Sequence, residues 1–142
     1  MNHLSQEMQA CIDACTRCHQ VCLSTAMNHC LEVGGEHVAK EHFTLMMACA
    51  EICRTSSTFM LIGSQHHKHV CRECAEICDQ CAADCERLDG MEECVRACRA
   101  CAASCRQMAA LEQDRAEAPG LLLARRRSGL LCLTDFGQAN DF

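Results

Sequence analysis

Cysteine is the residue type in this sequence whose number and spacing point to chemistry. The chain holds 17 cysteines among 142 residues. In residues 94–105, "CVRACRACAASC", successive cysteines are four, three and four positions apart. Thiols can bind soft metal ions, exchange disulfides or serve as small apolar side chains. The spacing of the cysteines helps to decide among these three uses.

Steps of three and four residues return to nearly the same side of an α-helix, because each residue turns the helix by about 100°. The spacing therefore places each run of cysteines on one buried stripe, where a bundle helix normally carries leucine. Two runs of four fall within an arc of about 60°, and a run of five falls within about 80°. Together with two from a second helix, the cysteines on these stripes are Cys11, Cys15, Cys18, Cys22, Cys49, Cys53, Cys71, Cys74, Cys78, Cys81, Cys85, Cys94, Cys98, Cys101 and Cys105.

Two cysteines do not follow this register. Regular helix geometry puts Cys30 about 100° from His29, so we expect it at the edge of the stripe or near the next loop. Cys132 lies outside any pattern. A purely apolar role explains the other fifteen poorly, because cysteine fills less space than leucine and would leave the metal-free core weakly packed.

Turn sequences with glycine divide the first 110 residues into four long segments. Gly34-Gly35, Gly63-Ser64 and Asp89-Gly90 are helix stop signals. We predict helices over roughly 4–32, 37–62, 65–87 and 90–110. Because short connections force antiparallel neighbours, the predicted fold class is all-α: an antiparallel up-down-up-down four-helix bundle with a cysteine-lined core.

The sequence predicts two regions, a metal-binding bundle over residues 1–110 and a C-terminal tail over 111–142. The tail mixes leucines with an arginine triplet and shows no clean helical face, so we expect it to be poorly ordered. A segment that docks on a membrane surface or on a partner protein is the alternative.

Composition and local sequence limit the binding partners and the cellular location of the protein. The formal net charge is −6, which gives no case for nucleic-acid binding. No apolar run reaches the roughly 18 residues needed to span a bilayer. The N-terminal sequence has no basic segment followed by an apolar one, so no signal peptide is predicted. An odd cysteine count and helical spacing also disfavour a disulfide scaffold, and we expect a cytoplasmic protein with free thiols.

Thiolates and thioethers are soft ligands that select Cu(I) and also suit zinc and iron–sulfur clusters. Zinc signatures usually place CxxC pairs on turns, and ferredoxin motifs keep their cysteines in a loop that ends in proline. Cysteines along continuous helices match neither pattern. A monovalent ion for each thiolate also leaves little net charge in the core. Multiple Cu(I) ions per chain therefore fit best.

Four segments carry a resemblance to a known family. They are "ACIDACTRCHQVC", "ACAEICR", "CRECAEICDQCAADCE" and "CVRACRACAASC". In this order they resemble the four-helix-bundle copper storage proteins, specifically the cytosolic bacterial branch, over residues 1 to about 110. The resemblance implies a bundle filled with Cu(I), the fifteen cysteines on the stripes as core ligands, and a homotetramer. Family members often carry histidines in the turn between helices three and four, whereas this chain has only Met91 there.

Further candidate ligands of lower rank lie near the ends of the predicted bundle. One end gathers Met8, Met60, His67 and Met108, and the other gathers His29, His42, Met46 and Met91, with Cys30 nearby. Such neutral ligands should bind Cu(I) more weakly than thiolates do, so they could pass ions inward. We favour the end with His42 for uptake, from a copper chaperone or a small thiol carrier.

The function that we predict is Cu(I) storage and buffering without catalysis. A metallothionein-like sink for zinc or cadmium would use the same thiols. A thiol–disulfide redox protein is a third hypothesis, since pairs such as Cys15 and Cys18 form CxxC motifs. A redox CxxC usually begins a helix beside a βαβ unit, where the helix dipole lowers the thiol pKa. These pairs lie inside predicted helices, which disfavours the redox hypothesis.

Overall fold

Four long helices make up most of the chain in this computed structural model, which describes residues 4–116 and the side chains of residues 4–111. They are α1 (Gln6–Thr25), α3 (Lys40–Leu61), α4 (His67–Cys85) and α5 (Glu92–Ala116). Between α1 and α3 lie the π-helical turn η1 (Ala26–Cys30), the short helix α2 (Leu31–Val33) and the 3₁₀ turn η2 (Gly35–Val38). All regular structure in residues 4–116 is helical, as the sequence predicts.

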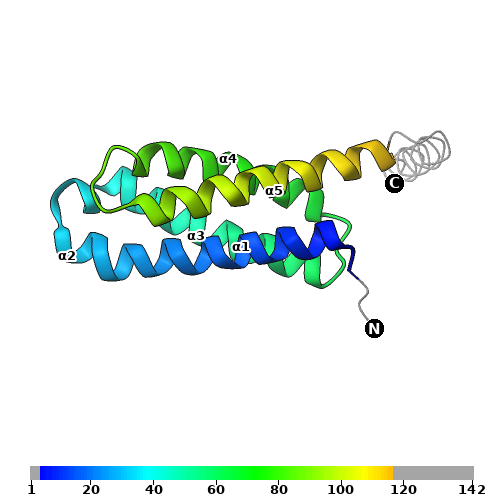
Figure 1. Ribbon diagram of the computed structural model, residues 1–142, viewed down its shortest axis with the longest axis horizontal. Coiled ribbons are helices and arrows are strands. Elements are labelled where there is room, and N and C mark those ends of the chain that lie inside the picture. Colours follow the sequence, from blue (N-terminus) through cyan, green and yellow to red (C-terminus); the bar gives the residue numbers. More distant parts are fainter. Residues whose placement is uncertain (1–3, 117–142) are drawn as a thin grey trace, which may run out of the picture. The chain divides into compact units, whose positions relative to one another are not determined.

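The four long helices run in alternating directions (Figure 1). Helix α3 packs against α1 and α4, and thiol contacts place α5 beside α1 and α4. We call the end that holds η2 and the α4–α5 turn the η2 end. The opposite end holds the start of α1 and the α3–α4 turn, and we call it the N-terminal end. The predicted up-down-up-down bundle is confirmed.

Apart from the end of α5, the observed helical segments begin and end within three residues of the prediction, with η1 and α2 continuing α1 up to Val33. Helix α5 continues to Ala116, six residues beyond the predicted end at residue 110. Residues 111–116, "LEQDRA", contain no glycine or proline, so nothing in them breaks the helix. The described residues up to Ala109 form one compact unit. Most of the predicted tail, including Cys132, lies outside the described residues.

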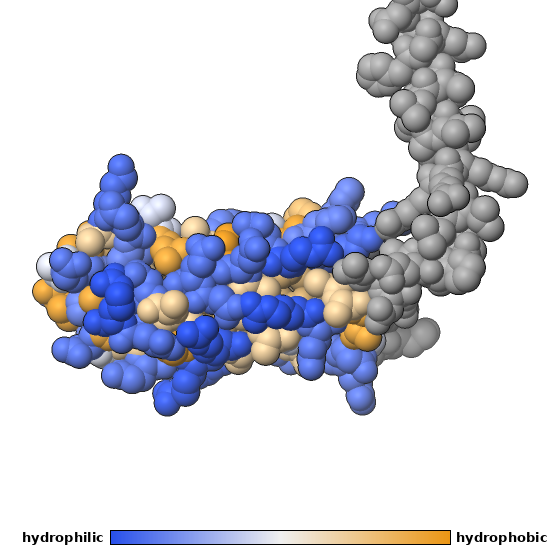
Figure 2. All heavy atoms as spheres, turned by 90° about the horizontal axis from the view of Figure 1, so that it is seen from above, coloured by the Kyte–Doolittle hydropathy of each residue, from blue (hydrophilic) through white to orange (hydrophobic). Residues whose placement is uncertain are grey.

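Small side chains fill the interior of the bundle. The buried apolar residues of its core are almost all cysteine, alanine or methionine. Hydrophilic side chains cover most of the face drawn in Figure 2, with apolar side chains between them. Ser5 caps the N-terminus of α1, because its Oγ accepts a hydrogen bond from the Met8 amide at 3.1 Å. Within residues 4–116, no helix is long and apolar enough to cross a bilayer.

Candidate metal centre

The cysteines of the four long helices meet along the centre of the bundle. Each of the sixteen cysteines in the described part of the chain is a free, buried thiol. The fifteen that the sequence places on helical stripes are at most 1% exposed. We call these fifteen residues the thiol core. Period-3.6 spacing on each helix, combined with antiparallel packing, brings all four stripes together.

Sulfur atoms from different helices are in contact throughout the thiol core. The Sγ atoms of Cys22 and Cys94 are 3.4 Å apart, and those of Cys53 and Cys78 are 3.5 Å apart. Even the diagonal helices α3 and α5 touch, because Cys49 Sγ lies 3.7 Å from Cys98 Sγ. A leucine core would hold these helices further apart. The short thiol side chains therefore bring ligand atoms within reach of shared ions.

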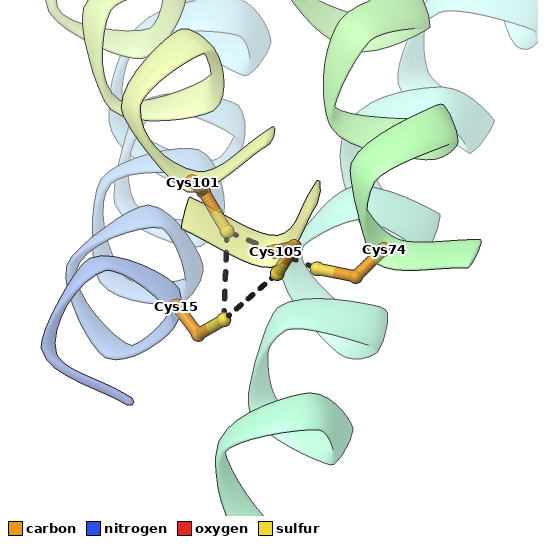
Figure 3. Close-up of side chains that lie close together, drawn as sticks. All are labelled: Cys15, Cys74, Cys101 and Cys105. Atoms are coloured by element: carbon orange, nitrogen blue, oxygen red, sulfur yellow. Dashed lines mark hydrogen bonds between the residues drawn. The ribbon is translucent and has the colours of Figure 1, made fainter. Parts of the chain in front are cut away.

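Several groups of four thiols are close enough to surround one ion. In each group all four Sγ atoms lie within 4.8 Å of one another. Figure 3 shows the group of Cys15, Cys74, Cys101 and Cys105, which joins side chains from α1, α4 and α5. Three groups share no residue, and they are Cys15/Cys74/Cys101/Cys105, Cys18/Cys49/Cys53/Cys78 and Cys22/Cys81/Cys94/Cys98. Other groups overlap these three, so the ligand set is continuous along the bundle.

The protonation states of the core thiols depend on one another. Hydrogen bonding from Cys101 and Cys22 lowers the pKa of the Cys18 thiol, because S–H donors stabilise the thiolate. The neighbours Cys18 and Cys49 raise the pKa of Cys22. Hydrogen bonding from Cys22 lowers the pKa of Cys94 to about 5. Ionisation of one thiol thus disfavours ionisation of the next, and a bound cation would remove that repulsion.

A methionine belongs to the same ligand set. The sulfur of Met46 lies 3.5 Å from Cys85 Sγ, 3.6 Å from Cys81 Sγ and 3.8 Å from Cys94 Sγ. The sequence groups Met46 with His42 near the end of the bundle, and the core thiols that Met46 contacts lie at that end, because Cys85 ends α4 and Cys94 lies in the first turn of α5. Because Met46 is fully buried, its thioether is a candidate ligand inside the core.

The π-helical turn η1 changes the register of the last part of the first helix. Regular geometry predicts His29 on the stripe and Cys30 at its edge. A π-helical turn holds more residues than an α-helical turn, so the positions after it rotate relative to the helix before it. Ala26 and Cys30 are consequently the buried residues, both fully buried, and His29 is only partly buried. Cys30 is therefore not at the edge of the stripe, whereas the other expected position, near the next loop, is confirmed.

Cys30 meets two further candidate ligands at the η2 end. Its Sγ lies 3.9 Å from His42 Nε2 and 3.9 Å from Met91 Sδ. His42 is 2% exposed and Met91 is 1% exposed. We call Cys30, His42 and Met91 the Cys30 site. Burial raises the pKa of the Cys30 thiol, and the nearby Cys94 thiol adds to that shift.

Two other histidines hold the α4–α5 turn at this end. The Nε2 atoms of His29 and His37 lie 3.2 Å and 2.9 Å from the carbonyl oxygen of Asp89. Each ring donates a proton to the carbonyl, because a carbonyl oxygen can only accept. A Cβ atom on Gly90 would lie 2.7 Å from the His29 ring. His29 therefore stabilises the turn, and its Nε2 is engaged in the hydrogen bond to the Asp89 carbonyl.

Methionine, serine and histidine close the opposite, N-terminal end. Met60 and Met108 are 0% and 4% exposed, His67 is 7% exposed, and Met8 is partly buried. Ser56 takes a stripe position on α3, and its Oγ lies 3.3 Å from Cys71 Sγ. The hydroxyl is a harder ligand than a thiol, so Ser56 interrupts the soft ligands of α3 between Cys53 and Met60.

Sequence reasoning missed one residue of this centre. Asp84 Oδ2 lies 2.6 Å from His42 Nδ1, and Arg87 pairs with the other carboxylate oxygen of Asp84. The i,i+3 spacing of Asp84 and Arg87 is visible in the sequence, but it is typical of an ordinary surface ion pair. Only the packing of α3 against α4 reveals the contact with His42.

The chain is similar to proteins of one family. A family model described as copper storage protein matches residues 4–110. An uncharacterized cysteine-rich protein of Bacillus subtilis, YhjQ, is 35% identical over 86 residues, which are 61% of this chain and 79% of the relative. The crystal structure of the Nmul_A1745 protein of Nitrosospira multiformis is 64% identical, with a TM-score of 0.74 over 75% of this chain and 97% of the other.

Two solved structures carry copper storage in their names. The Cu(I)-bound copper storage protein BsCsp3 is 35% identical, with a TM-score of 0.67 over 73% of this chain and 99% of that chain. The metal-free copper storage protein 3 of Bacillus subtilis is also 35% identical, with a TM-score of 0.59 over 71% and 97% of the two chains. Because the family model spans the whole thiol core, this chain belongs to the copper storage protein family.

Proposed function

We propose that this chain stores Cu(I), binding many ions through the cysteine thiolates of the thiol core. One observation carries the proposal: fifteen buried thiols form an unbroken set of neighbours along the bundle, with cross-helix Sγ distances such as 3.4 Å and 3.5 Å. A protein that needed one structural ion would need only four such ligands. The Cu(I)-bound relative, 35% identical to this chain, supports copper as the cargo.

The charge of the core favours a monovalent cargo. The buried polar residues of the described chain are histidine and serine, and none is lysine or arginine. Each tetrahedral site of a divalent ion with four thiolates would carry a net charge of −2 without a cation to balance it. One Cu(I) for each thiolate gives a neutral core, and bridging thiolates can share ions between neighbours.

A zinc or cadmium sink is the second candidate, and a specific feature favours it. Zinc–sulfur bonds of about 2.3 Å place the four sulfurs of a tetrahedron about 3.8 Å apart. The three groups of four that share no residue would therefore provide three closed sites. A thiol–disulfide role has less support, because Cys15 and Cys18 lie in the middle of α1, away from its N-terminus.

Metal titration of the reduced, metal-free chain tests the proposal. Under anaerobic conditions, Cu(I) is added against a competing chelator and bound copper is counted per chain, and the titration is repeated with Zn(II). Storage predicts many more tightly held Cu(I) than Zn(II) ions. Saturation with one or two Cu(I) ions would contradict storage, and three tight Zn(II) ions with little Cu(I) would favour the second candidate.

The proposal includes a cytoplasmic location and a function without catalysis. Free thiols in such number fit a reducing cytoplasm. Storage of an ion by core ligands needs no catalytic turnover. A copper chaperone or a small thiol carrier is the proposed donor. The family resemblance supports a homotetramer. Light scattering of the purified chain tests the oligomeric state, and a monomer at micromolar concentration would contradict the homotetramer.

A further inference from the structure

The Cys30 site differs chemically from the thiol core next to it. It offers one thiol, one thioether and one imidazole, whereas the core groups offer four thiols each. Metal–nitrogen and metal–sulfur bonds of about 2.0 and 2.3 Å place ligand atoms roughly 3.5 to 4 Å apart. The observed separations of 3.9 Å from Cys30 Sγ to His42 Nε2 and to Met91 Sδ match that range.

An imidazole binds a metal only through a nitrogen that carries no proton. In neutral histidine one ring nitrogen is protonated and the other has a free lone pair. His42 can therefore share a metal ion with Cys30 only if its proton lies on Nδ1, which leaves the lone pair of Nε2 free. In an isolated histidine, nothing fixes the proton on Nδ1.

Asp84 supplies that constraint. Its Oδ2 lies 2.6 Å from His42 Nδ1, and a carboxylate can only accept a hydrogen bond. The guanidinium of Arg87 pairs with the other carboxylate oxygen of Asp84. His42 Nδ1–H thus donates to a carboxylate on α4 that is already paired with a cation, and the bond also fixes the plane of the ring. The remaining nitrogen, Nε2, points toward Cys30.

We propose that Asp84 is a positioning residue, which orients His42 so that Cys30, His42 and Met91 form the first binding site for Cu(I) on its way into the thiol core. The proposal rests on the proposed storage function. Asp84 does not contact the ion. It acts through His42, as carboxylates that support metal-binding histidines generally do. With one thiol in place of four, the site should bind Cu(I) more weakly than the core and release it inward.

Helix α4 provides a matched control for Asp84. Asp79 lies on the same helix, pairs with Arg99 and Arg106, and has a side chain 29% exposed, against 23% for Asp84. Replacing either aspartate removes one negative charge and at least one arginine ion pair. Only Asp84 contacts a histidine, so a difference between the two variants isolates the effect on His42.

The test compares Cu(I) uptake by the full metal-free chain and by its variants Asp84→Ala, Asp84→Asn and Asp79→Ala. Stopped-flow absorbance follows the transfer of Cu(I) from a coloured chelator complex. Asp84→Ala should slow uptake about tenfold without changing the final number of ions. Asp84→Asn should recover most of the rate, because its amide oxygen can still accept from His42 Nδ1. Asp79→Ala should behave as the unaltered chain does.

Three results would overturn the role of Asp84. They are an unchanged rate in Asp84→Ala, equal slowing in Asp79→Ala, or no recovery in Asp84→Asn. Long-range ¹H–¹⁵N NMR of the metal-free chain tests the same point without copper. The imidazole of His42 should carry its proton on Nδ1, and a proton on Nε2 would refute the proposal. If the unaltered chain takes up few ions, the storage function fails instead, and the NMR result still decides the role of Asp84.

Discussion

The Sγ atoms of Cys22 and Cys94 lie 3.4 Å apart, although the two residues are 72 positions apart in the chain. Cys22 also contacts Cys18, Cys49 and Cys98, at 3.8, 3.8 and 3.5 Å. This thiol therefore touches neighbours on α1, α3 and α5. Its position joins two of the four-thiol groups into one continuous ligand set.

Replacing Cys22 should lower copper capacity without emptying the core. We expect Cys22→Ser to lose about one Cu(I) per chain, because neighbouring thiols can still bridge the remaining ions. Cys132→Ser is the control, since Cys132 lies outside the helical pattern, and it should leave capacity unchanged. Copper bound per chain after anaerobic loading measures both variants. A clear loss in Cys132→Ser would show that this cysteine also binds copper.

The metal-free bundle should lose stability at alkaline pH. Neighbouring thiols raise the pKa of Cys22, and burial raises that of Cys30, so both thiols hold their protons in the folded state. In the unfolded chain the same thiols ionise near their ordinary pKa of about 8.5. The stability that these two thiols contribute is thus fully present below about pH 8.5 and falls as pH rises beyond it.

Urea unfolding followed by circular dichroism measures this effect at pH 7.5 and pH 9.5 under anaerobic conditions. The midpoint should fall at the higher pH for the metal-free protein. Thiols with a lowered pKa, such as Cys18, act in the opposite direction, but repulsion prevents all neighbours from ionising together. An unchanged or higher midpoint at pH 9.5 would show that the folded core accommodates as many thiolates as the unfolded chain.

Copper should stabilise the bundle, because the folded state presents the thiols together and the unfolded chain does not. A single site gains about 4 kcal/mol when the free ion is present at a thousand times its Kd. Many sites should therefore move the thermal midpoint upward strongly. Calorimetry of metal-free and loaded protein compares the two states. Equal midpoints would mean that the ions bind outside the folded core.

Gly90 should tolerate alanine less well than Gly63 does. Both glycines have positive φ angles, 79° and 69°, so alanine costs about 1 kcal/mol in backbone strain at either position. A Cβ on Gly90 would also lie 2.7 Å from the His29 ring, whereas a Cβ on Gly63 would meet nothing within 4 Å. Gly90→Ala should thus lower the free energy of unfolding more than Gly63→Ala, as urea titrations would measure. Equal losses would mean that His29 moves aside at no cost.

Much of this architecture could be predicted from residue spacing. The period of the cysteines indicates helices, and the glycine turns set their number and antiparallel order. The burial of Cys30 could not be predicted, because a regular 100° step cannot anticipate the π-helical turn at Ala26–Cys30. Asp84 resembles a surface residue in the sequence, and its contact with His42 depends on how α3 packs against α4.

Cu(I) storage in the thiol core is tested most directly by a crystal structure of the copper-loaded chain, with anomalous diffraction recorded at the copper absorption edge. Storage predicts several copper peaks in a row between the four helices, each bonded to Sγ atoms of the thiol core, such as those of Cys22, Cys49 and Cys98. Copper confined to histidines on the surface, with the core thiols unmetallated, would contradict it.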